Sequence, residues 1–301
     1  MPITRLDQML EAVKAKPRKR LVAAFANDGH TIKAVHDAMA KGIVDATLVG
    51  DEAVIAARCQ ELGIDPGPFT IVHEPVDTRA AARAVALVRS GEGQILMKGL
   101  VSTDKYMRAI LNKEAGLLEP NAILSHVTVI ENPRYPKLII CGDVAVIPYP
   151  ELKEKIAIAN YCIGVAHALG VVRPKVAIIA ASEQVLPKVQ PTLDAAVIAK
   201  MAERGQIKGA AVDGPMALDV AIDPESARTK GIGGEVAGDA DCLVFPNIDA
   251  GNVFYKTNTK LAGCELGAMV AGAMAPCILS SRGDSVLTKL YSITLAALTA
   301  K

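Results

Sequence analysis

The sequence predicts an α/β protein, and three observations carry that prediction. Short apolar runs alternate with segments of helical periodicity through the first hundred residues. Aromatic residues make up only 3% of the 301 residues and Trp is absent, so the core has to be aliphatic, as in buried parallel sheets. Continuous β-branched runs follow from about residue 124. A chain of this length can form one large domain or two ordinary ones.

The N-terminal part alternates strand with helix. Gly63 directly follows the second helix and is a natural C-terminal cap. The alternation requires parallel crossover connections, and hence an α/β sheet. The predicted strands are 20–26, 46–49, 69–73 and 94–98, and the predicted helices are 31–41, 52–62 and 78–90.

The second part predicts another α/β lobe that contains some antiparallel pairing. A tight polar connection at 132–136 joins two β-branched runs and indicates a hairpin. The apolar stretch 266–280 is too short to span a membrane and contains Pro276, so we interpret it as buried. The last helix, 284–299, returns to the first lobe. We therefore expect one domain of residues 1–125 with 276–301, and a second of 126–275. The other predicted strands are 126–130, 138–146, 176–180, 208–212 and 242–245, and the other helices are 151–169 and 192–204.

Charge and cysteine usage exclude several classes of protein. The chain has 33 Lys and Arg against 32 Asp and Glu, so no broad basic face for nucleic acid is expected. The six cysteines are scattered without a C-x-x-C pair, and the five histidines lack metal-ligand spacing. The N-terminus has no apolar signal core. We expect a cytoplasmic protein with no membrane segment, no nucleic-acid partner and no metal site.

The segment SSRGDS at 280–285 is the sharpest candidate for chemistry. It follows an apolar run and precedes a helix, so backbone N–H groups, hydroxyls and the guanidinium of Arg282 can together form an anion cradle with Ser281. The alternative is an ordinary capping turn in which Asp284 or Ser285 is the N-cap residue.

A second candidate is LMKGLVSTDKYMRAIL at 96–111. A strand ends at Lys98, and Ser102 and Thr103 begin a helix that carries Arg108. Ligands of open α/β sheets bind beyond the carboxyl ends of strands, where this loop should lie. Alternatively, Lys98 and Arg108 are solvated surface cations.

Two further segments follow predicted strands. FPNIDAGNVFYK at 245–256 places Asn247 and Asn252 in a loop whose Gly permits close approach of the backbone to a ligand, or in a well-bonded turn. Asp213 and Asp219 are acid–base candidates, although carboxylates at strand ends often only cap helices. The sequence contains neither a Walker A nor a G-x-G-x-x-G motif, so it lacks the usual signatures of nucleotide hydrolysis and dinucleotide oxidation.

Together, LMKGLVSTDKYMRAILNKEAGL, VDGPMALDVAI, FPNIDAGNVFYK and SSRGDSVLTKLYSI resemble the phosphate acetyl/butyryltransferase family in order and spacing, from about residue 20 to the end. MKGLV and SRGDS-x-x-x-K resemble its butyryltransferase branch. The resemblance implies two α/β/α lobes of the isocitrate and isopropylmalate dehydrogenase type with a central cleft, and a homodimer or higher homo-oligomer. It also implies reversible transfer of a short acyl group between CoA and phosphate, with CoA as a substrate and no tightly bound cofactor.

Carried over by motif, the family's phosphate-site residues fall on Ser281 and Arg282, and its second essential arginine falls on Arg108. The resemblance also implies that the asparagine segment, with Asn247 and Asn252, faces the cleft. We add Lys98, Ser102, Thr103 and Asp284 as candidate binding residues. Thr288 stands where the acetyltransferase branch has the aspartate that deprotonates the thiol of CoA. The base is then Asp284, another carboxylate, or none.

The chemistry of the candidate residues is consistent with this resemblance. Two arginines can neutralise and orient an acyl phosphate, and Ser281 can donate to an oxygen that gains negative charge. The rival interpretations are a phosphate acetyltransferase, an NAD- and metal-dependent decarboxylating dehydrogenase of the same fold, and a non-catalytic CoA or acyl-phosphate regulator.

Overall fold

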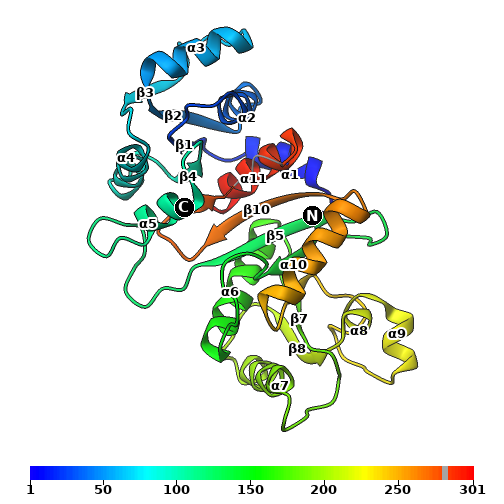
Figure 1. Ribbon diagram of the computed structural model, residues 1–301. Coiled ribbons are helices and arrows are strands. Elements are labelled where there is room, and N and C mark those ends of the chain that lie inside the picture. The colour runs from blue at the N-terminus through cyan, green and yellow to red at the C-terminus, as the bar shows by residue number, and fades with distance from the viewer. Residues whose placement is uncertain (280–283) are drawn as a thin grey trace. The chain divides into compact units, whose positions relative to one another are not determined.

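The computed structural model describes residues 1–279 and 284–301. These residues form two compact units. Unit 1 contains Met1–Leu6 and Ser125–Leu266, and unit 2 contains Asp7–Leu124 and Gly267–Lys301. Each unit combines a sheet with helices, which confirms the predicted α/β class (Figure 1). No helix in the described part of the chain is long and apolar enough to cross a membrane.

Within unit 2, which includes most of β10, the strands follow the order β3-β2-β1-β4-β11-β10. Its strands β1 to β4 are parallel, as the alternating pattern predicts, and β11 is parallel to β4 but antiparallel to β10, so the sheet is mixed. The strands are β1 Lys19–Ala24, β2 Val44–Gly50, β3 Thr70–His73, β4 Ile95–Lys98, β10 Glu265–Ala271 and β11 Cys277–Ile278. The helices are α1 Leu6–Lys14, α2 Gly29–Ala40, α3 Glu52–Leu62, α4 Asp77–Arg89, α5 Thr103–Ile110 and α11 Val286–Thr299.

Local chemistry sets the helix ends of unit 2. The Asp28 carboxylate accepts a hydrogen bond from the backbone N–H of Thr31 where α2 begins. Gly63 ends α3 in the left-handed conformation with φ 65°, as its position after the helix predicts. The centre of the sheet is aliphatic, with Leu21 and Leu48 fully buried.

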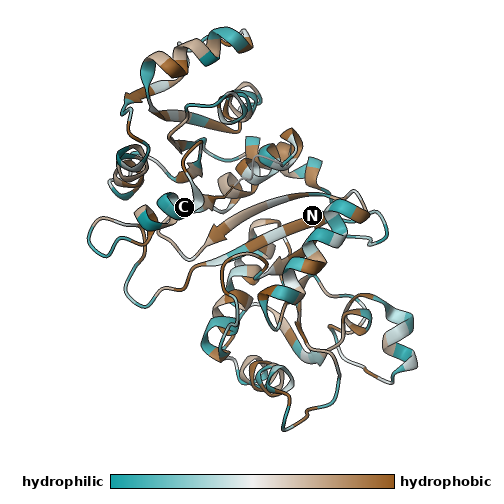
Figure 2. Ribbon diagram, in the orientation of Figure 1, coloured by the Kyte–Doolittle hydropathy of each residue, from teal (hydrophilic) through white to brown (hydrophobic). Residues whose placement is uncertain are grey.

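Within unit 1, the strands follow the order β5-β6-β9-β7-β8. Antiparallel pairing of β5 with β6 confirms the predicted hairpin, whereas β6, β9, β7 and β8 are parallel. The strands are β5 Ser125–Glu131, β6 Ile139–Gly142, β7 Lys175–Ile179, β8 Ala211–Met216 and β9 Cys242–Val244. The helices are α6 Leu152–Ala168, α7 Gln190–Glu203, α8 Leu218–Ile222, α9 Pro224–Thr229, α10 Ile248–Lys256 and the π-helical turn η1 Thr257–Leu261. Helices α6 and α7 carry both hydrophilic and hydrophobic residues (Figure 2). The buried residues of α6 include Ile158, Cys162 and Ala166, whose spacing of four places them on one face of the helix.

The structure corrects two details of the prediction for unit 1. Strand β8 starts at Ala211 rather than at 208, because Gly209 has a φ of 77° and breaks the extended conformation before it. The strand continues to Met216, so Asp213 lies within it and not after it. The segment 248–256, predicted as an asparagine-containing loop, is helix α10, and its residue Gly251 is buried.

Candidate active site

In unit 2, strands β4 and β11 end side by side. The parallel register pairs Cys277 with Leu96 and Ile278 with Met97. The buried Tyr106 hydroxyl on α5 reaches the carbonyl oxygens of Leu96 at 3.2 Å and Ile278 at 3.3 Å, and so ties α5 to both strands. The chain therefore leaves the two strands, after Lys98 and after Ile278, at the same carboxyl edge of the sheet. Such an edge is where ligands of α/β sheets bind.

Lys98 holds the loop that follows β4. Its ammonium donates to the carbonyl oxygens of Gly99 at 3.1 Å and Val101 at 3.0 Å. Gly99 packs against the main chain so closely that a Cβ there would lie 2.4 Å from the carbonyl oxygen of Phe25. The loop is thus built from close backbone contacts and lysine hydrogen bonds, and the ammonium closes the turn that leads into α5.

The other candidates of this segment are exposed on α5. Ser102 is the N-cap residue, with its hydroxyl accepting from the N–H of Lys105 at 3.4 Å, and Thr103 is the first helical residue. The side chain of Arg108 is 79% exposed and pairs with Asp104 at 3.2 Å. An exposed pair of this kind contributes little to stability, so the guanidinium can exchange this carboxylate for another anion at small cost.

Ser281 and Arg282 lie outside the described residues. On the far side of that gap, Ser285 is the N-cap residue of α11, and its hydroxyl accepts from the N–H of Thr288 at 2.9 Å. Ser285, rather than Asp284, is therefore the capping residue, and Asp284 precedes the helix. The Ser285 hydroxyl also lies 3.1 Å from that of Thr288, and the next residue, Lys289, is only 6% exposed. The first turn of α11 thus carries the hydroxyls of Ser285 and Thr288, and the buried residue Lys289 follows them.

In unit 1, a buried carboxylate shapes the loop that follows β6. Asp143 is 2% exposed. One carboxylate oxygen accepts from the Ser125 hydroxyl at 2.9 Å and the His126 N–H at 3.0 Å, and the other accepts from the N–H groups of Ala145 at 2.7 Å and Val146 at 2.8 Å. Four donors satisfy the carboxylate fully, so the loop at this edge has one defined conformation.

The two asparagines predicted from the sequence lie in and just before α10, next to the loop that follows β6. Asn247 is the N-cap residue of α10 and accepts from the N–H of Ala250 at 3.0 Å. Asn252 donates from its side chain to the Val144 carbonyl oxygen at 3.1 Å. Gly251 packs under the loop, where a Cβ would lie 2.4 Å from the carbonyl oxygen of Asp143. The segment is thus a helix that locks the loop after β6, and the glycine serves close packing there.

The two other acid–base candidates have local partners. Asp213 accepts from the N–H of Gly214 at 2.8 Å. Asp219 on α8 lies 2.9 Å from the ammonium of Lys230, which also reaches Glu183 at 3.2 Å. The hydrogen bond from Lys230 lowers the pKa of Asp219, so this carboxylate is a weaker base than an ordinary aspartate.

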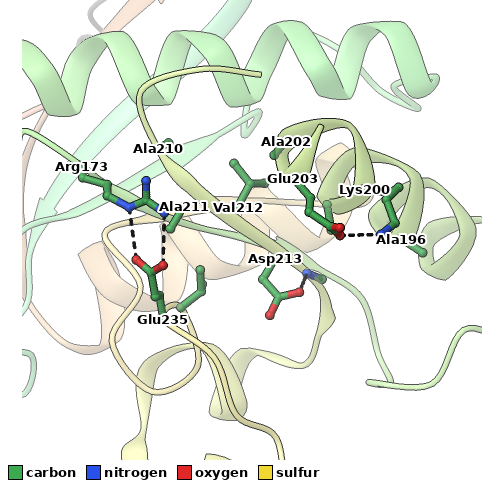
Figure 3. A pocket seen from close by; sticks show the side chains of 13 residues that line it. Arg173, Ala196, Lys200, Ala202, Glu203, Ala210, Ala211, Val212, Asp213 and Glu235 are labelled. Atoms are coloured by element: carbon green, nitrogen blue, oxygen red, sulfur yellow. Dashed lines mark hydrogen bonds and ion pairs between the residues drawn. The ribbon is translucent and has the colours of Figure 1, made fainter. Parts of the chain in front are cut away.

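A hollow of about 390 Å³ runs along β8 and α7 (Figure 3). Its two lining cations are already paired: Arg173 binds both carboxylate oxygens of Glu235 at 3.1 Å, and Lys200 binds Glu203 at 2.5 Å. Asp213 adds another negative charge to the wall. This hollow therefore does not suit phosphate.

A second hollow of unit 1, of about 430 Å³, includes Asn247 in its wall. Tyr149, Lys155 and Asp194 also line it, and sequence reasoning missed all three residues. The available signal was proline placement: Pro150, Pro191 and Pro246 stand beside the starts of three helices.

The six cysteines are free and buried, and no group of three potential metal ligands occurs among the described residues. Burial raises the pKa of every thiol, to about 12 for Cys162 and Cys277. A raised pKa leaves a smaller thiolate fraction at any given pH, and the thiolate is the reactive form.

We therefore expect a disulfide reagent at pH 8 to modify less than about one thiol per native chain, because burial suppresses both access and ionisation. In urea the same reagent should count all six thiols. Rapid reaction of any thiol of the native chain with the reagent would contradict the burial of the six cysteines.

Comparisons with known proteins agree on one family. The model of the family described as "Phosphate acetyl/butaryl transferase" matches residues 5–83 and 68–297. A phosphate butyryltransferase of Clostridium acetobutylicum is 47% identical over 298 residues, covering 99% of each chain. A phosphate acetyltransferase of Thermotoga maritima is 38% identical, covering 97% of this chain and 98% of its own. The crystal structure of a branched-chain phosphotransacylase from Enterococcus faecalis superposes with a TM-score of 0.81 at 29% identity, over 93% of this chain and 98% of that one.

Proposed function

We propose, from the premise that this chain belongs to the phosphate acetyl/butyryltransferase family and is a phosphate acyltransferase, that its preferred acyl group has four carbons. The observation that supports this preference is sequence identity. The chain is 47% identical to a phosphate butyryltransferase over 99% of both chains, and 38% identical to a phosphate acetyltransferase. The substrates are then butyryl-CoA and phosphate in one direction, and butyryl phosphate and CoA in the other.

The transfer proceeds in a single ternary complex. In the direction of thioester formation, the sulfur of CoA attacks the acyl carbon of the acyl phosphate. The carbon–sulfur bond forms, and the bond from the acyl carbon to the phosphate oxygen breaks, with its electron pair leaving on phosphate. Arg282 and Arg108 neutralise that charge, and the hydroxyl of Ser281 donates to an oxygen as negative charge builds on it. Holding both substrates in line supplies much of the rate.

The shared edge of β4 and β11 supports this assignment. The segments before Arg108 and before Ser281 leave the sheet as neighbours, and α5 is bonded to both strands through Tyr106. The proton of the thiol needs a separate acceptor, because Thr288 has no carboxylate. Asp284 is the carboxylate nearest in the chain to Ser281 and Arg282, and we retain it as a binding residue and candidate base.

Further parts of the proposal rest on the family resemblance. They are two lobes of the isocitrate dehydrogenase type with the substrates in a central cleft, a homodimer or higher homo-oligomer, a cytoplasmic location, and CoA as a substrate without a tightly bound cofactor. Light scattering on the purified chain tests the oligomer, and a monomer under assay conditions would exclude it.

Acyl-chain preference is expected to rise from acetyl to butyryl. We expect kcat/KM with phosphate to be at least about tenfold higher for butyryl- or isobutyryl-CoA than for acetyl-CoA, because each methylene buried in an apolar pocket contributes about 1–3 kcal/mol. The measurement is a set of kcat/KM values across acetyl-, propionyl-, butyryl- and isobutyryl-CoA. A preference for acetyl-CoA would reassign the chain to acetyl transfer, and absence of thiol release from every thioester would reject the transferase itself.

A further inference from the structure

Helix α5 carries Arg108 but is too short to hold its own position. It has eight residues, and isolated helices shorter than about 12–15 residues are marginal in water. Of its residues, Tyr106 and Ile110 are buried. Lys105 also pairs with Asp77 at 2.6 Å, but their side chains are 41% and 30% exposed, so this pair contributes little to stability. The position of Arg108 therefore depends mainly on the two buried side chains.

The hydroxyl of Tyr106 is buried where β4 and β11 lie side by side. It lies 3.2 Å from the carbonyl oxygen of Leu96 and 3.3 Å from that of Ile278. A phenol has one O–H, so the two carbonyl oxygens share a single donor. Burial raises the pKa of Tyr106 well above its ordinary value, so the hydroxyl keeps its hydrogen throughout the neutral pH range. Helix α5 thus always offers this donor to the main chain of both strands.

Strand β11 depends on such support because it has only two residues, Cys277 and Ile278. Both pair with β4, and Cys277 alone pairs with β10. Burial raises the pKa of Cys277, and a hydrogen bond with Tyr106 offsets part of that rise. The Tyr106 hydroxyl therefore contacts both residues of this strand, and any shift of the hydroxyl displaces α5 relative to β11.

The aim of Arg108 is set by the helix that carries it. Its side chain is 79% exposed, so packing of its own does not fix it. The carboxyl ends of β4 and β11, beside the Tyr106 hydroxyl, form the kind of sheet edge at which ligands bind. A displacement of about 1 Å in a group that orients a substrate can lower a rate by about 10²-fold. The hydroxyl is thus placed to set the distance between Arg108 and this edge.

We propose that Tyr106 is a positioning residue for acyl transfer, and that its hydroxyl fixes Arg108 relative to the carboxyl ends of β4 and β11. The inference rests on the proposed function, in which Arg108 neutralises charge on the phosphate. It goes beyond that function because Tyr106 is fully buried and acts only through α5. The ring supplies packing, which a phenylalanine also supplies, whereas the hydroxyl sets the position of the helix.

The test compares Tyr106→Phe, which keeps the buried ring, with the matched control Tyr135→Phe. The Tyr135 hydroxyl donates to the carbonyl oxygen of Ala240 at 2.6 Å, in unit 1, beside the amino ends of β6 and β9. Each change removes a phenol hydrogen bond to the main chain, so both should lower Tm by about 2–4 °C. We expect Tyr106→Phe to lower kcat for butyryl-CoA and phosphate about tenfold, with KM values within about twofold, because a misplaced guanidinium loses most in the transition state. The control should keep kcat within about twofold.

A double-variant cycle with Arg108→Gln makes the result specific to positioning. In the Arg108→Gln background, Tyr106→Phe should lower kcat by less than about twofold further, because the group that it positions is already absent. A general weakening of unit 2 would instead lower kcat about tenfold again in that background. Such an additive loss would overturn the inference.

The pH profile of kcat separates positioning from proton transfer. The profile of Tyr106→Phe should be lower than that of the wild type but keep its shape, whereas loss of one limb would make Tyr106 an acid or base and overturn the positioning role. Equal kcat in Tyr106→Phe and an active wild type would overturn the inference alone. A wild type that releases no thiol from any acyl-CoA would reject the proposed function, and the inference with it.

Discussion

Replacing Arg282 with Gln is expected to lower kcat/KM for butyryl-CoA and phosphate by about 10²–10³-fold, the usual effect of removing one group that stabilises charge in a transition state. Gln keeps much of the side-chain length but loses the positive charge and the bidentate fork that match a phosphate. The loss should fall mainly on kcat, because charge on the leaving phosphate is greatest in the transition state. Arg108→Gln should act in the same direction, and the double variant should lose less than the sum of the two.

The matched control is Arg58→Gln on α3. Arg58, like Arg108, forms an exposed ion pair within its own helix, 2.6 Å from Glu61. This control should keep its activity within about twofold, since exposed pairs contribute little to stability. Steady-state kinetics with butyryl-CoA and phosphate measure all four variants. If Arg282→Gln retained full turnover, the charge-neutralising role of SSRGDS would be wrong. A regulator without catalysis would show no activity to lose.

Replacing Asp194 with Ala is expected to destabilise the protein by about 3–5 kcal/mol. The change removes the partner of Lys155, which lies 2.6 Å away with a side chain only 5% exposed, and so leaves a buried ammonium unpaired. It also leaves the side-chain amide of Gln190 without its acceptor, because this amide donates to the same carboxylate at 2.7 Å. Urea unfolding followed by circular dichroism measures the loss in the transition that reports unit 1.

Two variants make this result specific. The double change Lys155→Met with Asp194→Leu should recover most of the lost stability, because an apolar pair of similar volume has no desolvation cost. Glu203→Ala, which breaks the exposed pair with Lys200 on the same helix α7, should change stability by less than about 0.5 kcal/mol. If Asp194→Ala cost no more than Glu203→Ala, the buried pair would not be a supporting element of unit 1.

Local sequence patterns were sufficient to predict much of the fold. Asp28 before α2, Gly63 after α3 and Ser102 before α5 occupy the cap positions that their residue types predict, because capping depends on a few neighbouring atoms. The hairpin of β5 and β6 was also predictable, since a short polar connection separates two β-branched runs.

The asparagine segment shows where local patterns fail. Asn and Gly in FPNIDAGNVFYK are typical of a loop, yet Asn247 caps a helix, and Gly251 is required by the main chain of Asp143, a residue 108 positions earlier in the chain. The four hydrogen bonds of Asp143 and the pairing of Lys155 with Asp194 likewise join residues that no local window contains. Such contacts depend on how strands and helices pack, which periodicity does not encode.

By itself, the sequence therefore determined the α/β class and the positions of most helices and strands, because these follow from periodicity and capping within short windows. It also supplied the prediction that SSRGDS and Arg108 bind an anion, which rests on residue chemistry and resemblance. Only the tertiary structure decided that the β4 and β11 segments leave one sheet edge together, that Asn252 locks the loop after β6, and that three helix starts line a hollow at Tyr149. The physical reason is that a parallel sheet aligns the carboxyl ends of strands distant in sequence, and side chains acquire their partners only there.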